Sequence, residues 1–89
     1  MGTYCIDGTV LRDKIKDLVM NYILTAPACD KHAEGMRTAE IFRECGLDWG
    51  GQENATSAQQ QYWLVALLRV LENEGRIIRD PVTKKWRRI

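Results

Sequence analysis

Residues 58–74 constrain the fold most strongly, because they form the most apolar part of the chain and their apolar side chains recur at helical spacing. These side chains are Trp63, Leu64, Leu67, Leu68, Val70 and Leu71. Gly75 follows at the position where glycine commonly ends a helix. Thr56 and Ser57 are each followed by a glutamine three residues later, which is a capping-box pattern. We therefore predict a central helix over 58–74 that buries Trp63 together with the leucines.

A helix with one buried face is predicted over residues 10–25. Its apolar positions are Leu11, Ile15, Leu18, Val19, Tyr22 and Ile23. Thr9 is the predicted N-cap, and Pro27 ends the helix because the residue before a proline avoids helical geometry. This helix is a possible seam of a homodimer, but the core is expected to need its whole apolar face. The sequence leaves dimerisation open.

A shorter helix is predicted over residues 39–45, with Thr38 as its N-cap and Gly46 as its left-handed stop. Its apolar side is formed by Ile41, Phe42 and Cys45. The remaining segments are a loop at 28–35, a very short extended piece at 36–38 and a loop at 47–56.

The last 14 residues change in both pattern and charge. Residues 76–79 and 85–89 are short extended segments on either side of a proline-containing turn at 80–84, which predicts a β-hairpin. These 14 residues hold six Lys or Arg against one Asp, whereas the preceding 75 hold seven against eleven Asp or Glu. This asymmetry indicates that the basic end is the contact surface, even though the formal net charge is only +1.

The predicted order of helix, short extended piece, helix, helix and β-hairpin resembles the winged helix-turn-helix family over about residues 9–89. The segment TAEIFRECGL at 38–47 resembles the family's second helix and turn. The leucines of the third helix, followed by GRIIR at 75–79, resemble a recognition helix that runs into a wing. KKWR at 84–87 resembles the returning wing strand, whose aromatic residue packs on the core.

This resemblance implies an α+β, mainly α fold with three helices and a C-terminal β-hairpin wing. The length of the chain predicts one domain over residues 1–89, in which residues 1–8 form a flexible N-terminal arm. The resemblance also implies double-stranded DNA binding, with the third helix in the major groove and the wing on the neighbouring backbone.

Hydrogen-bonding side chains occupy the leading turns of the third helix. They are Ser57, Gln59, Gln60, Gln61 and Tyr62. Glutamine can pair bidentately with adenine, and a helix N-terminus favours phosphate. The other interpretation is that the glutamines are good helix formers on a solvated face.

Cationic side chains supply the second predicted contact surface. They are Arg37, Arg79, Lys84, Lys85 and Arg87. On a wing they would neutralise DNA phosphates, and Arg37 would add a phosphate contact before the second helix. Alternatively, the wing lysines serve solubility and protect a sheet edge, and Arg37 pairs with a carboxylate.

Residues suited to catalysis or metal binding do not form a convincing pattern. Cys5, Cys29, His32 and Cys45 are of zinc-binding type, but only Cys29 and His32 are closely spaced. No two carboxylates stand out by their spacing as a general acid and base. The glycines at 50 and 51 are not followed by the Lys-Ser/Thr of a phosphate-binding loop. We predict no enzymatic activity, no metal and no cofactor.

The chain contains no stretch of about 20 apolar residues that could span a bilayer. Its N-terminus lacks the basic and apolar regions of a secretory signal. Its three cysteines are odd in number and widely spaced, which argues against a disulfide framework. These features predict a cytoplasmic protein that does not associate with membranes.

The predicted function is therefore double-stranded DNA binding, by a transcriptional regulator or by the DNA-reading module of a larger protein. The alternative is a winged-helix module that binds proteins and not nucleic acid, which the acidic first two helices favour. That alternative predicts an exposed apolar patch. Whether the chain acts as a homodimer or with a fused or separate partner protein is left open.

Overall fold

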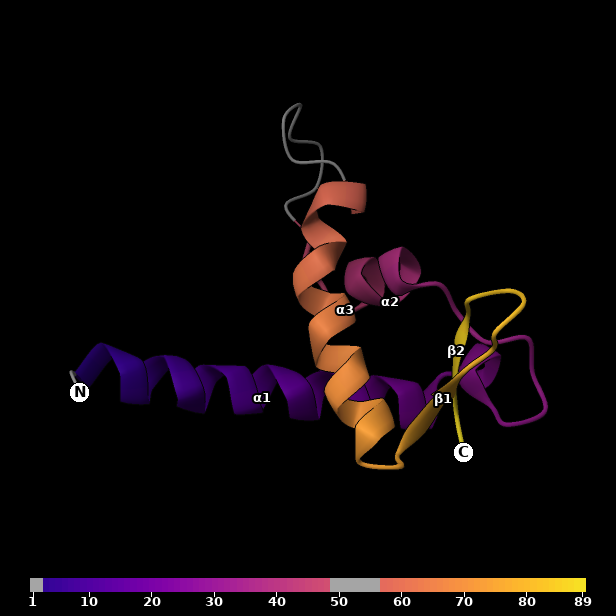
Figure 1. The fold of residues 1–89 in the computed structure, drawn as a ribbon, viewed down its shortest axis with the longest axis horizontal. Coiled ribbons are helices and arrows are strands. Elements are labelled where there is room, and N and C mark those ends of the chain that lie inside the picture. Colours follow the sequence, from indigo (N-terminus) through magenta and orange to yellow (C-terminus); the bar gives the residue numbers. More distant parts are fainter. Residues whose placement is uncertain (1–2, 49–56) are drawn as a thin grey trace.

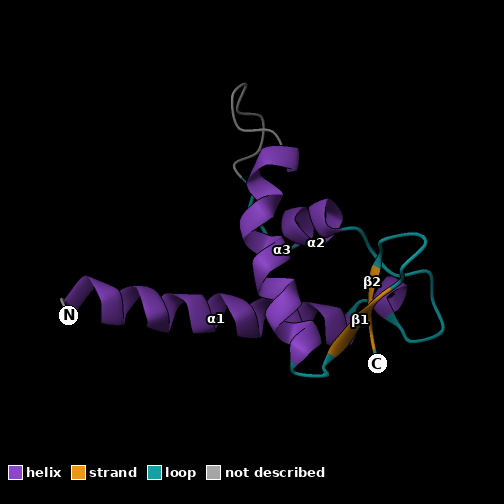
Figure 2. Cartoon of the chain, in the orientation of Figure 1, coloured by secondary structure: helices purple, strands orange, loops and turns teal. Residues whose placement is uncertain are grey.

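The computed structural model describes residues 3–48 and 57–89, which form three α-helices and a small antiparallel sheet (Figures 1 and 2). The elements are α1 (Thr3–Thr25), the 3-10 helix η1 (Pro27–Cys29), α2 (Thr38–Glu44), α3 (Ser57–Asn73), β1 (Ile77–Arg79) and β2 (Trp86–Arg88). The predicted mainly helical α+β class with a C-terminal hairpin is confirmed. The capping-box residue Thr56 and most of the predicted 47–56 loop lie outside the described residues.

Helix α1 begins at Thr3, and the predicted start at residue 10 is wrong. Residues 3–8, which were expected to form an arm, are its first turns. Thr9 is not an N-cap, because its hydroxyl lies inside the helix and donates to the carbonyl of Cys5, at 2.9 Å. The helix ends at Thr25, before Pro27, as predicted.

The buried residues of α1 lie in its C-terminal third and are Val19, Met20 and Ile23. Ile15 and Tyr22 are half-buried and pack against the same core cluster. Leu11 and Leu18 were expected in the core, but 58% and 46% of their respective surfaces remain exposed. The reason is the crossing geometry: α3 crosses α1 in its C-terminal half, so the earlier turns extend beyond the rest of the protein (Figure 1).

Helix α2 begins at Thr38, and Arg37 occupies its N-cap position without a side-chain capping hydrogen bond. Thr38 was expected to cap the helix. Instead its buried hydroxyl accepts a hydrogen bond from Nε1 of Trp86, at 2.9 Å. Gly46 has a φ of +70°, which confirms the predicted left-handed stop after this helix.

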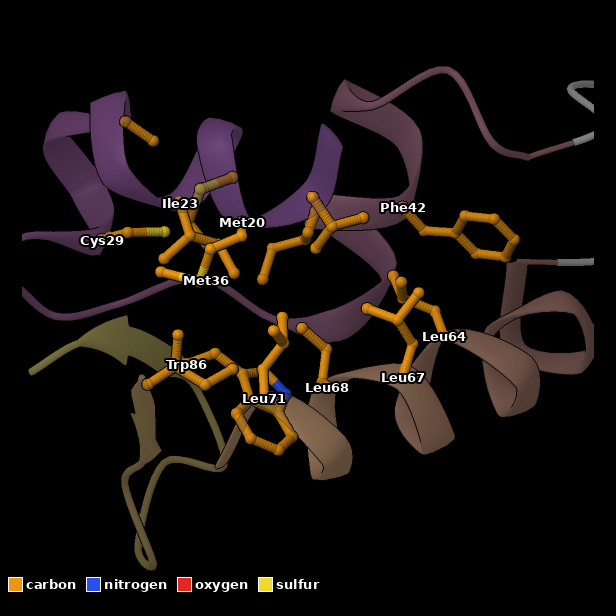
Figure 3. Close-up of a cluster of buried hydrophobic side chains, with 14 residues drawn as sticks. Met20, Ile23, Cys29, Met36, Phe42, Leu64, Leu67, Leu68, Leu71 and Trp86 are labelled. Atoms are coloured by element: carbon orange, nitrogen blue, oxygen red, sulfur yellow. The ribbon is translucent and has the colours of Figure 1, made fainter. Parts of the chain in front are cut away.

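Helix α3 supplies the largest share of the core. Its residues Leu64, Leu67, Leu68 and Leu71 face α1 and α2, and Trp86 closes the cluster from the hairpin (Figure 3). Trp86 is fully buried, as predicted. Trp63 is 46% exposed, so its assignment to the core is wrong. The four leucines already fill the side of α3 that faces the core, and Trp63 lies at the flank of that side.

The two strands pair with Ile77 opposite Arg88 and Arg79 opposite Trp86. Met36 adds an isolated antiparallel bridge on the other edge of β2, through two backbone hydrogen bonds of 2.7 and 2.8 Å with Trp86. The short extended piece predicted at 36–38 is thus present at Met36. No helix within the described segments is long and apolar enough to span a membrane.

Candidate nucleic-acid interface

Helix α3 exposes the side opposite its buried leucines. Tyr62 is 75% exposed on this side, and the side chain of Arg69 is 55% exposed and pairs with Glu72 at 3.5 Å. Ser57, Gln59, Gln60 and Gln61 belong to the first turns of α3, but their side chains lie outside the described part of the structure. The solvent-exposed surface of α3 is therefore available for contact along most of its length.

The hairpin turn is organised by Asp80. Its Oδ1 accepts hydrogen bonds from the backbone N–H groups of Val82, at 2.8 Å, and Thr83, at 3.0 Å. These bonds, together with the nearby guanidinium of Arg87, lower the pKa of the Asp80 carboxyl. The turn ends at Lys84, which is exposed and has a left-handed φ of +64°.

Three of the predicted DNA-contact residues on the hairpin have partners within the protein. The guanidinium of Arg79 lies 5.1 Å from the ring centre of Trp86, in a cation–π contact. Lys85 pairs with Glu34 at 3.4 Å, and Arg87 pairs with the carboxylate that organises the turn, at 3.8 Å. Lys84 has no ion pair among the described residues and is the most available cation of the turn.

Arg88, the remaining cation of β2, joins the hairpin to α1. Its Nη1 donates to the carbonyls of Ile23, at 2.8 Å, and Ala26, at 3.1 Å, and its Nη2 contacts Asp30 at 3.0 Å. The pKa of Asp30 is lowered, first by the backbone N–H of His32 and then by this guanidinium. Arg88 therefore stabilises the C-terminal end of α1, where backbone carbonyls lack helical partners.

Most of the predicted contact residues belong to two parts of the fold, the N-terminal end of α3 and the β1–β2 hairpin. In Figure 1 the N-terminal end of α3 and the hairpin turn both point toward the top of the view, and α2 lies between them. Arg37 is exposed at the start of α2 and forms no ion pair with a carboxylate in the described segments. The turn carries Lys84 and Lys85, whereas Arg79 and Arg87 lie on the strands below it.

A groove where α1 crosses α3 was not predicted. It has a volume of about 440 Å³ and is lined by Arg12, Asp13, Lys16, Trp63, Ala66, Leu67 and Val70. Lys16 forms an ion pair with Glu74 beside it. Trp63, Ala66 and Val70 form a second stripe along α3, and of these residues Trp63 was predicted to lie in the core.

Two of the three cysteines considered as zinc ligands, Cys29 and Cys45, lie in or beside the core. Burial raises the pKa of both thiols, so both are protonated at neutral pH. His32 is exposed. Within residues 3–48 and 57–89 no three His, Cys, Asp or Glu side chains are grouped to hold a metal ion.

Comparison of the chain with protein-family models, with curated protein sequences and with solved structures found no match.

Proposed function

We propose that this protein binds double-stranded DNA as a winged helix-turn-helix domain, with α3 in the major groove and the β1–β2 hairpin on the adjacent backbone. The observation that carries the proposal is the solvent-exposed side of α3, which lies next to a hairpin turn with the exposed Lys84. The bridge at Met36 adds support, because it supplies the short extended piece between the first two helices.

The shape of α3 suits a major groove, which is wide enough to admit one α-helix. From residue 62 onward, the buried side chains of α3 lie on one side, so insertion of the opposite side would not disturb the core. Tyr62 and Arg69 are on that exposed side, and the glutamines at 59–61 belong to the leading turns. Hydrogen bonds from these glutamines to base edges would provide sequence preference.

The electrostatic contribution of the hairpin is expected to be modest. Lys84 is open to solvent, and Lys85, whose side chain is 22% exposed, pairs with Glu34, whose side chain is 88% exposed. Because water surrounds the carboxylate, this ion pair contributes little free energy, and Lys85 can exchange the carboxylate for a phosphate. Contacts with about two to four phosphates would give log K against log salt a slope of about −2 to −4.

The test is fluorescence anisotropy of a labelled random duplex across a salt series. We expect Lys84→Gln combined with Lys85→Gln to weaken binding to all sequences and to flatten the salt slope by about 1 to 2. Arg76→Gln is the matched control. It removes an exposed cation that lies at the other end of α3 and pairs with Glu74 at 3.4 Å. Gln60→Ala is expected to change sequence preference with the salt slope unaltered.

Two results would reject the proposal. One is the absence of binding to any duplex at about 50 mM salt, where even non-specific DNA binders retain affinity. The other is an equal effect per charge removed in the double lysine variant and in the Arg76 control, because binding would then follow net charge and not the hairpin.

The second candidate function is protein binding, and the groove between α1 and α3 favours it. Trp63 and Val70 each expose 46% of their surface at this groove, beside the cations Arg12 and Lys16. Exposed apolar side chains ringed by charge are typical of protein-binding surfaces. If a Trp63→Ala variant binds DNA as tightly as the parent, the groove takes no part in DNA recognition. If this variant loses DNA binding, the groove belongs to the DNA-binding surface.

A further inference from the structure

The first half of α1 buries none of its side chains against the described part of the protein. Residues 3–14 are all exposed, and α1 extends to the left of Figure 1 beyond the other elements. Helices derive most of their stability from packing an apolar face, and Gly8 lowers the intrinsic stability of this segment further. A helical segment of this kind is best explained by contact with another molecule.

A heptad stripe runs along this helix. Its members, spaced alternately four and three residues apart, are Tyr4, Gly8, Leu11, Ile15, Leu18 and Tyr22. Alternating spacing of four and three is the pattern of a coiled-coil seam. Tyr4 is 91% exposed and Leu11 is 58% exposed, whereas Ile15 and Tyr22 are half-buried and pack against the core. The N-terminal part of the stripe is therefore available for a second helix, and Ile15 still offers part of its surface.

We propose that two copies of this chain associate through an antiparallel pairing of their α1 helices over about residues 4–15. In this register Leu11 of each copy packs over Gly8 of the other, and Tyr4 of each packs against Ile15 of the other. A two-fold axis relates the two copies, so the contact is closed and self-complementary.

The charges beside the stripe select this register. Asp7 and Lys14 each come immediately before a member of the stripe, Gly8 and Ile15 respectively. Antiparallel pairing brings Asp7 of each copy opposite Lys14 of the other, so the dimer has two such contacts. Sliding the helices by one heptad would instead set Lys14 opposite Lys14 and Arg12 opposite Arg12. Both of these like-charge contacts are unfavourable.

The size of the side chains disfavours a parallel pair. Parallel helices in register would set Gly8 opposite Gly8 and leave a void in the seam. A Cβ added at Gly8 meets no atom of the same chain within 4 Å, so the space above this residue is open. The antiparallel arrangement fills that space with Leu11 of the second copy.

The first test is sedimentation equilibrium of the full chain between about 1 µM and about 1 mM, the range of Kd expected of a small interface. We expect a reversible monomer–dimer equilibrium. Leu11→Lys should raise the dimer Kd more than about tenfold, because a charge replaces the central apolar contact. Val10→Lys is the matched control, since Val10 is 47% exposed but lies off the stripe.

Neither lysine variant touches the core, and far-UV circular dichroism would verify that both remain folded. The proposal is overturned if the parent chain stays monomeric throughout this range, or if both lysine variants weaken the dimer equally.

The register has its own test. Asp7→Lys alone and Lys14→Asp alone each turn two attractive contacts into repulsive ones, so each should raise the Kd by about tenfold. The double variant exchanges the charges and should restore the Kd to within about threefold of the parent value. Failure of the double variant to recover would overturn the antiparallel pairing even if a dimer exists. These readouts involve no DNA and are independent of the proposed DNA binding.

Discussion

Replacement of Gly35 by alanine is the sharpest test of how the hairpin joins the helices. Gly35 has a φ of +90°, a left-handed conformation that residues with a Cβ rarely adopt. A Cβ at this position would lie 2.7 Å from the carbonyl oxygen of Trp86 and 3.1 Å from its carbonyl carbon. That oxygen accepts the backbone hydrogen bond of Met36, so it cannot move aside without loosening the bridge between Met36 and β2.

The magnitude follows from two contributions. The left-handed backbone costs a residue with a Cβ about 1–2 kcal/mol. Displacing the Trp86 carbonyl weakens a buried hydrogen bond, which costs about another 1–2 kcal/mol. We therefore expect Gly35→Ala to lower the free energy of unfolding by about 3 kcal/mol, which for a chain of this length lowers Tm by about 15 °C.

Urea denaturation and thermal unfolding, both followed by circular dichroism, measure this loss. Gly46→Ala is the control, because Gly46 also has a positive φ, of +70°, but an added Cβ would meet no atom within 4 Å. The control isolates the backbone contribution and should cost only about 1 kcal/mol. Equal losses in the two variants would refute the steric contact between Gly35 and β2.

Two further predictions concern the hairpin. Trp86→Phe leaves the buried hydroxyl of Thr38 without its indole donor, and Thr38→Val leaves the indole N–H without its acceptor. The double variant should lose about 1–2 kcal/mol less than the two single losses combined; strict additivity in urea denaturation would contradict this coupling. For Asp80, a pKa lowered in the folded state means that the carboxylate stabilises the fold above the ordinary carboxyl pKa, and that this contribution disappears as pH falls through the lowered value. Asp80→Asn keeps the acceptor oxygen, so Tm measured from pH 7 to pH 2 should fall less steeply than in the parent; an unchanged slope would contradict the assignment.

Sequence patterns were sufficient for the elements whose signals are local. The leucine stripe of α3, the proline that follows α1 and the glycine after α2 act through their own backbone and nearest turns. The hairpin was likewise predicted from its β-branched strands and its turn. The helical state of residues 3–8 was missed, because this segment has no N-cap signal and lacks a clear polar face.

The contact residues were predicted less completely than the elements. Their positions on α3 and the hairpin followed from the pattern, but the internal partners of Lys85 and Arg87 did not. Glu34 is 51 residues away from Lys85 in the chain, and no local spacing relates the two. The role of Arg88 also depends on the carbonyls of Ile23 and Ala26, which only the folded chain brings near.

Apart from residues 3–9, the sequence by itself determined the helical and extended segments of the described chain, because helix and strand periodicity are properties of consecutive residues. Only the tertiary structure decided which apolar faces are buried. Trp63 and Leu11 have helical spacing as good as that of Leu67 and Ile23, yet both stay largely exposed. Leu11 lies in the turns of α1 that extend beyond its crossing with α3, and Trp63 lies at the flank of the side of α3 that the leucines fill. A crossing point depends on packing between distant segments, and the periodicity of either helix alone does not contain it.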